Sequence, residues 1–160
     1  MIEVYIPFNR SIFNRNSTII DGQKQVLYQH KISWFYSELS LYQDQHLIYV
    51  AYRRMSLKTI YDIKHLDEII CSVKISNFPF SLRHEIETRI GNYEVKGKPY
   101  RSLFEIIHQN QTVLSIKEDV NLVNYRIILV DESNIGFLLM LMFVLITAEY
   151  KDRRHTFIDF

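Results

Sequence analysis

The feature that most limits how this chain can fold is an apolar run near its carboxyl end, Ile135–Ala148. Its residues carry no charge, and only Gly136 and Thr147 interrupt the large apolar side chains. The run is too long for a strand of the usual ~5–6 residues, so its length predicts a helix. Capping oxygens and negative charge precede it at residues 131–133, and cations follow it at residues 151–154. These flanks place the helix near 132–151.

A helix that is apolar on all sides is either a membrane span or is enclosed by protein. Fourteen uncharged residues rising ~1.5 Å each cover ~21 Å, which is short of the ~30 Å hydrocarbon layer. Extending the run meets Glu132 on one side and Glu149 on the other. Burying such charges in lipid costs a few kcal/mol each. A buried core helix is therefore preferred, and a C-terminal membrane anchor is the alternative.

The rest of the chain is typical of β-strands. Segments rich in Ile, Val, Tyr and Phe alternate with polar residues, as in 83–90, where His84, Ile86 and Thr88 lie opposite the charged side chains. Within 68–75, one apolar face is predicted to hold Ile69, Cys71, Val73 and Ile75. Hairpin turns are marked by Asp21-Gly22, Asp44-Gln45 and Asn110. Strands are predicted near residues 2–6, 17–20, 24–30, 33–42, 46–54, 57–64, 67–75, 83–90, 92–97, 101–107, 112–118 and 122–130.

These elements predict a mainly β fold, a closed antiparallel β-barrel of about twelve strands around a C-terminal central hydrophobic α-helix. A barrel of that size has a lumen wider than its side chains can fill, and a helix of ~10 Å diameter is a suitable core. The 160 residues suit one core, and no Ser/Gly/Pro-rich linker divides them. A single domain over 1–160 is therefore predicted.

Charge and cysteine content exclude some classes of protein. Nineteen basic and 18 acidic residues give a net charge of +1, which argues against a nucleic-acid binder that relies on phosphate neutralisation. The single cysteine, Cys71, excludes an intrachain disulfide and fits a reducing compartment. The opening "MIEVYIPFNR" lacks the apolar core of a signal peptide. A cytoplasmic location is expected, with no nucleic-acid partner.

Catalytic and metal-binding patterns are weak. The six histidines have no metal-ligand spacing and are predicted to be exposed or half-buried strand residues. The pairs Glu85/Glu87 and Asp131/Glu132 resemble a solvated strand face and a helix start more than acid–base dyads. Nucleophile-elbow, P-loop and dinucleotide-binding motifs do not occur. We predict a non-enzymatic protein with no metal and no cofactor.

Two basic clusters are candidate binding sites for an anionic ligand. Each combines cations with a tyrosine at the end of a predicted hairpin, in "YRRMSLK" and in "KGKPYR". The cations are Arg53, Arg54 and Lys58 in the first cluster and Lys96, Lys98 and Arg101 in the second. Such groups can contact lipid head groups or polyphosphates, although ordinary solvated loop charge has the same pattern.

Several segments, in this order, resemble the tubby C-terminal-like superfamily. They are "IIDGQKQVLYQHK", then "YEVKG" followed by "YRSLFEI", and finally the apolar helix after a short acidic turn. Within that superfamily the chain is similar to the LURP-one-related proteins and their small bacterial homologues, with phospholipid scramblases as more distant relatives. The resemblance implies a twelve-stranded closed barrel threaded by a central hydrophobic helix.

The resemblance is less informative about function. Tubby proteins bind phosphoinositides and scramblase relatives act at membranes, but this chain lacks the tubby lipid-binding positions, a calcium loop and a palmitoylated cysteine tract. Lipid binding therefore does not transfer residue by residue. The expected function is an interaction module, cytoplasmic or membrane-peripheral, for anionic phospholipid or a membrane-associated protein. The alternatives are a small-molecule carrier with a surface pocket between barrel and loops, and a tail-anchored protein.

Overall fold

The structure, a computed structural model, describes residues 1–7, 16–78, 81–99, 103–117 and 125–158. It contains a strand at each of the twelve predicted positions and one long helix. The strands are β1 (Ile2–Pro7), β2 (Asn16–Ile20), β3 (Val26–Ile32), β4 (Glu38–Gln43), β5 (His46–Arg53), β6 (Thr59–His65), β7 (Glu68–Phe78), β8 (Ser81–Thr88), β9 (Tyr93–Lys98), β10 (Leu103–His108), β11 (Gln111–Lys117) and β12 (Tyr125–Val130). The mainly β prediction is confirmed.

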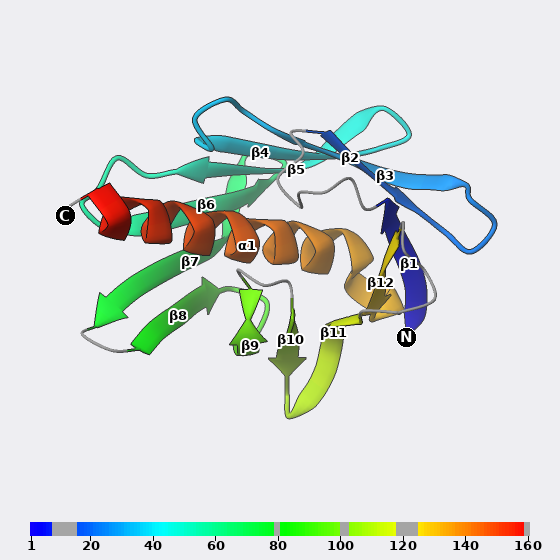
Figure 1. The fold of residues 1–160 in the computed structure, drawn as a ribbon. Coiled ribbons are helices and arrows are strands. Elements are labelled where there is room, and N and C mark those ends of the chain that lie inside the picture. Colours follow the sequence, from blue (N-terminus) through cyan, green and yellow to red (C-terminus); the bar gives the residue numbers. More distant parts are fainter. Residues whose placement is uncertain (8–15, 79–80, 100–102, 118–124, 159–160) are drawn as a thin grey trace.

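The strands form one antiparallel sheet that curls around the helix (Figure 1). Its order is β8-β7-β6-β5-β4-β3-β2-β1-β12-β11-β10-β9. The first strand pairs with the last, with Ile2 opposite Val130 and Pro7 opposite Tyr125. This β1–β12 ladder joins the strands β1–β8 and the strands β9–β12 into one sheet.

The predicted barrel around a C-terminal helix is confirmed, and it is nearly closed. Strands β8 and β9 are the two ends of the sheet, and no ladder joins them in the part of the chain that the structure describes. After β8 the chain stays attached to β7, because the backbone N–H of Arg89 donates to the carbonyl of Ile70 over 3.3 Å. The chain therefore continues along β7 before it reaches Tyr93, instead of turning back as a tight hairpin.

The helix occupies the lumen. A 3₁₀ turn, η2 (Glu132–Asn134), leads into α1 (Ile135–Ile158), and every residue from Phe137 to Glu149 is buried. Asp131 caps the turn, since its carboxylate accepts from the backbone N–H of Ser133 over 3.3 Å and from its hydroxyl over 2.8 Å. These hydrogen bonds lower the pKa of Asp131.

The helix is longer than predicted at its carboxyl end. It reaches Ile158, whereas the sequence placed its end near residue 151. The apolar run does end near there, but residues 151–158 contain no Gly or Pro to stop the helix, and cations are favourable at a helix carboxyl end.

Residues on the inner face of the strands pack around α1. Alternation within each strand gives a core that includes Val4, Ile19, Leu39, Tyr61 and Leu114. The core contains Cys71, Val73 and Ile75, as predicted for 68–75. Ile69 is an exception. A β-bulge between Ile63 and Lys64 shifts the β6–β7 register, so Ile70 packs on the core while Ile69 is exposed.

The segment predicted as a strand over 33–42 begins later, at Glu38. Residues 33–37 form a loop in which the N–H of Tyr36 donates to the carbonyl of Ser33 over 3.1 Å. The Ser33 hydroxyl also accepts from the N–H groups of Ser37 and Glu38. The prediction of a strand over residues 33–37 is therefore wrong, and these residues form part of the surface instead.

The barrel has two rims of different character. The C-terminal rim is defined by the loops Ser33–Ser37 and Arg54–Lys58 and lies at the carboxyl end of α1, since the rings of Tyr36 and Tyr150 are 5.5 Å apart. The opposite, N-terminal rim holds η2 and the turns Asp21–Gln25, Asp44–Gln45, Leu66–Asp67 and Gln109–Asn110. Figure 1 shows α1 running from the N-terminal rim on the right to the C-terminal rim on the left.

The stretch Glu132–Tyr150 is long and apolar enough to cross a membrane by length and composition. Most of it is enclosed by the strands, so its apolar side chains face the protein core. An enclosed apolar helix is consistent with a soluble protein.

Candidate functional site

The first predicted basic cluster lies on the C-terminal rim, where β5 ends and β6 begins. Arg53 is the last residue of β5, and Arg54 and Lys58 belong to the loop that follows. The N–H of Arg54 donates to the carbonyl of Ile60 over 2.9 Å, which closes this loop at its base. The N–H of Arg53 donates to the carbonyl of Ser37 over 2.9 Å, so the two loops of the rim are joined by a backbone hydrogen bond.

A hollow of about 580 Å³ opens between these two loops. Its lining residues are Ser37, Arg53, Arg54, Met55, Ser56 and Leu57, and we call it the rim hollow. Arg53 is half-buried, and its Nε is buried without a hydrogen-bond partner among the described residues. Because a guanidinium is always charged, such a group favours an anion nearby. The positive charge of Arg53 also acts on Tyr61, whose pKa is nevertheless raised by burial.

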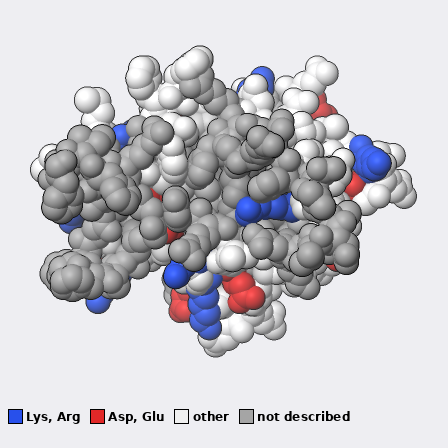
Figure 2. All heavy atoms as spheres, viewed as in Figure 1, with Lys and Arg blue, Asp and Glu red and all other residues white. Residues whose placement is uncertain are grey.

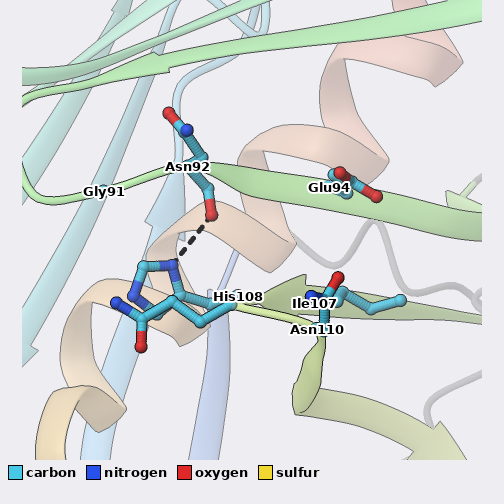
Figure 3. A pocket seen from close by; sticks show the side chains of 7 residues that line it. Gly91, Asn92, Glu94, Ile107, His108 and Asn110 are labelled. Atoms are coloured by element: carbon cyan, nitrogen blue, oxygen red, sulfur yellow. Dashed lines mark hydrogen bonds between the residues drawn. The ribbon is translucent and has the colours of Figure 1, made fainter.

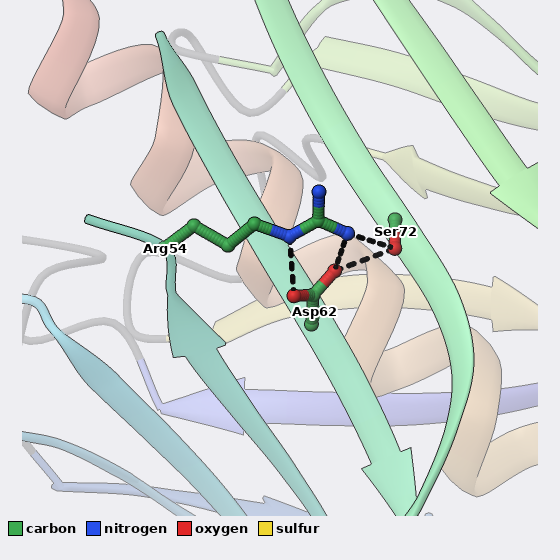
Figure 4. Close-up of polar contacts among 3 residues, drawn as sticks. All are labelled: Arg54, Asp62 and Ser72. Carbon is green, nitrogen blue, oxygen red and sulfur yellow. Dashed lines mark hydrogen bonds and ion pairs between the residues drawn. The ribbon is translucent and has the colours of Figure 1, made fainter. Parts of the chain in front are cut away.

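Arg54 is held by the protein itself (Figure 4). Its Nε and Nη2 donate to the two carboxylate oxygens of Asp62 over 2.6 and 2.7 Å, and Nη2 lies 3.3 Å from the hydroxyl of Ser72. That hydroxyl donates to Asp62 in turn. Burial raises the pKa of Asp62, but the hydrogen bonds from Arg54 and Ser72 outweigh burial and leave this pKa below its usual value. Asp62 thus neutralises one of the three predicted cations.

We expect Asp62→Ala to destabilise the protein by about 1–3 kcal/mol, because Arg54 and Ser72 lose their shared acceptor. Chemical denaturation at neutral pH measures this change. The matched control is Glu85→Ala, which removes an exposed ion pair with Lys74 at 3.0 Å and should cost about 0–1 kcal/mol. Equal effects of the two variants would show that the Arg54–Asp62–Ser72 group has no special role in stability.

The second predicted cluster is on the same rim but at another part of the wall. Lys96 and Lys98 are exposed residues of β9, and Arg101 lies outside the described residues. Strands β5 and β9 run in the same direction, so Lys98 and Arg53 end at one rim, with β6, β7 and β8 between them. The described residues of the two basic clusters therefore lie at the same end of the barrel but form two separate sites.

The backbone conformation explains why residue 97, in the "YEVKG" segment, is a glycine. Its φ is +105°, and a Cβ there would lie 2.5 Å from the carbonyl oxygen of Leu103 on β10. Only glycine fits this close approach without displacing backbone.

Exposed apolar side chains on the two rim loops were not predicted from the sequence. Trp34 and Phe35 are 74% and 80% exposed, and Met55 and Leu57 are fully exposed. Trp34 and Phe35 are the central residues of the turn Ser33–Tyr36. The signal that could have revealed this loop is the pair of serines that flank "WFY", because serine hydroxyls commonly cap turns.

A second hollow, of about 390 Å³, lies on the N-terminal rim at the β10–β11 turn (Figure 3). His108 is half-buried beside it, with its Nδ1 2.8 Å from the carbonyl of Asn92 and its ring stacked on Tyr93 at 4.4 Å. Most of the remaining lining is polar or glycine, from Gly91, Asn92, Glu94, Gln109 and Asn110.

One histidine departs from the prediction of exposed or half-buried side chains. His30 is 1% exposed on the inner face of β3, where its ring stacks on Phe143 of α1 with centroids 3.7 Å apart. Burial lowers the pKa of His30 to about 3, so its imidazole is neutral. The strand alternation that turns Tyr28 and Ile32 inward also turns His30 inward.

The described interior contains one further polar contact near the carboxyl end of α1. Nε2 of His84 on β8 lies 3.5 Å from Oε2 of the buried Glu149. No described group of three His, Cys, Asp or Glu side chains is arranged to hold a metal ion. The thiol of Cys71 is buried, and burial raises its pKa to about 12, so it remains protonated.

On the face seen in Figure 2, the described charged residues do not form a large field of one sign. In the view of Figure 2, Lys and Arg side chains are interspersed with Asp and Glu among the described residues.

Comparison with known proteins gives a likeness of fold. No protein-family profile and no curated protein sequence matches the chain. The chain is similar to the X-ray structure of a protein from Arabidopsis thaliana, with a TM-score of 0.63 over 90% of each chain at 12% identity. This neighbour has the same size, and the likeness supports a twelve-stranded near-barrel around a buried helix as the shared architecture.

Proposed function

We propose that the protein is a non-enzymatic interaction module of the tubby-like type that binds anionic groups at a membrane surface through its C-terminal rim. The observation that carries the proposal is the rim hollow, where Arg53 offers a half-buried guanidinium whose Nε has no hydrogen-bond partner among the described residues. Lys58 is an exposed residue of the loop that follows Arg53. A hollow of this volume is within the range of small-ligand sites.

The filled lumen supports a surface role. Because α1 occupies the interior, a ligand has access to the rims and the outer wall only. Around the rim hollow, Arg54 is neutralised by Asp62, so Arg53 and Lys58 supply the local positive charge. In this proposal the protein is cytoplasmic and membrane-peripheral, and its partner is anionic phospholipid or a membrane-associated protein that presents similar charge.

The test is co-sedimentation with vesicles of phosphatidylcholine that either contain or lack phosphatidylserine. We expect binding to the acidic vesicles only, weakened by added salt because exposed charges are screened. A basic side chain near an acidic surface contributes about 1 kcal/mol. Lys58→Glu reverses one charge and should therefore lower binding by roughly tenfold.

The matched control is Lys24→Glu, which makes the same change of charge at an exposed position on the N-terminal rim. It should leave vesicle binding close to that of the unchanged protein. Equal binding to neutral and acidic vesicles, or equal losses for the two variants, would reject the proposed site.

A small-molecule carrier is a second candidate function, favoured by the hollow of about 390 Å³ beside His108. A ligand there would be polar, given the lining of amides, Glu94 and backbone. Stabilisation of the protein by a small metabolite, together with no affinity for acidic vesicles, would favour this role over the first.

A further inference from the structure

The two rim loops carry large apolar side chains with no function in the core. Their exposed tips are Trp34, Phe35, Met55 and Leu57. Each of these residues lies in a connection between strands, beyond the last ladder pair of the barrel wall. We call these four residues the apolar tips. Side chains of this size, gathered on adjacent loops, indicate a surface that contacts something apolar.

The loops that carry the tips are firmly held. The carbonyl of Ser37 accepts from the N–H of Arg53, and the hydroxyl of the buried Tyr61 donates to the carbonyl of Tyr36. The ring of Tyr36 also lies 5.5 Å from that of Tyr150 on α1. The barrel and the central helix therefore fix the two loops relative to each other, and the tips are presented by a preorganised surface.

Charge separates this rim from the opposite one. The segments Ser33–Ser37 and Arg54–Lys58 contain two cations and no carboxylate. The described turns of the N-terminal rim contain four carboxylates, Asp21, Asp44, Asp67 and Glu132, and one cation, Lys24. Acidic residues near the start of α1 and basic residues near its end also suit the helix dipole. The dipole does not account for the apolar tips, which carry no charge.

We propose that the apolar tips insert into the interfacial layer of an acidic phospholipid bilayer, with the rim hollow and Lys58 at the level of the head groups. This inference rests on the proposed function and specifies how the rim meets the membrane. Tryptophan and other amphipathic or apolar side chains are favoured at the boundary between head groups and acyl chains. Binding by such a surface combines buried apolar area with attraction to acidic lipid.

Trp34 is the only tryptophan of the chain, so its fluorescence reports on this surface directly. With phosphatidylcholine–phosphatidylserine vesicles, its emission should move to shorter wavelength, and lipids brominated on their acyl chains should quench it. The double variant Phe35→Ser/Leu57→Ser should lose at least about tenfold in vesicle binding, because two apolar side chains are withdrawn from the interface. Circular dichroism checks that this variant is folded.

The control is Leu66→Ser, which removes an apolar side chain that is 82% exposed at a turn of the N-terminal rim. This variant should bind vesicles as the unchanged protein does. If acidic vesicles bind the protein but brominated lipid does not quench Trp34, insertion is rejected while the proposed function stands. If acidic vesicles do not bind it, both are rejected. A shift of Trp34 emission that depends on protein concentration without vesicles would make the tips a contact between copies of the chain and overturn the inference.

Discussion

A chain that ends at Asn134 is expected to have no cooperative thermal transition. Truncation there removes α1, whose apolar run includes eleven large side chains buried or half-buried by the strands. At ~1.5–3 kcal/mol each, their burial contributes on the order of 20 kcal/mol as an upper bound. A domain has a net stability of ~5–15 kcal/mol, so the strands cannot keep the barrel folded around an empty lumen. Circular dichroism during heating measures the loss.

A point variant tests the same feature without shortening the chain. Leu141→Asp places an unpaired charge at a fully buried position of α1 and should unfold the protein or lower its stability by more than about 4 kcal/mol. The control Leu66→Asp makes the same replacement at an exposed turn residue with φ +48°, a conformation that Asp tolerates. It should change stability by no more than about 0.5 kcal/mol. A cooperative transition in the truncated chain would contradict the central role of α1.

The architecture could be predicted because two sequence patterns agree. The run Ile135–Ala148 is apolar on all sides, and such a helix needs an enclosing wall. The preceding residues alternate with a period of two, which provides strands with one inward apolar face. The predicted hairpin turn at Asp44-Gln45 is also confirmed. Both residues adopt positive φ, as expected for a two-residue hairpin loop.

Local composition misled the prediction in the segment 33–37. The aromatic residues of "WFY" favour strands, so residues 33–37 were predicted as the start of a strand, although Ser33 folds them into a loop. At the β6–β7 turn, Leu66 adopts a φ of +48°. Leucine carries no turn signal, and the closing of this hairpin depends on the pairing of its flanking strands.

For the candidate site, the sequence predicted which residues are charged but not how they are arranged. Arg53, Arg54 and Lys58 are adjacent in the sequence, but the pairing of Arg54 with Asp62 depends on how β5 and β6 are aligned. The half-buried position of Arg53 similarly follows from its place opposite Tyr61 on the inner face of the rim. The exposure of Trp34 and Phe35 could not be seen while their segment was assigned to a strand.

The stability of the protein is expected to fall as the pH drops from about 6.5, and His30 is expected to cause a large part of this loss. In the folded protein the pKa of His30 is about 3, whereas an unfolded histidine has a pKa near 6.5. Between these values the unfolded chain binds a proton that the folded chain does not, so the free energy of unfolding decreases by about 1.4 kcal/mol per pH unit. The total loss by pH 3 is on the order of 4–5 kcal/mol.

His30→Leu should make this acid-dependent loss clearly shallower, as measured by chemical denaturation at a series of pH values from 7 to 4. At neutral pH the stability of the variant should lie within about 1–2 kcal/mol of that of the parent. The two ring nitrogens of His30 have no described hydrogen-bond partner, and leucine replaces the ring with an apolar side chain of similar size. The matched control is His46→Leu, which makes the same replacement at an exposed position of β5 and should leave the slope unchanged. An acid slope in His30→Leu as steep as in the parent would show that protonation of other groups governs unfolding, and that the stack on Phe143 does not exclude the proton.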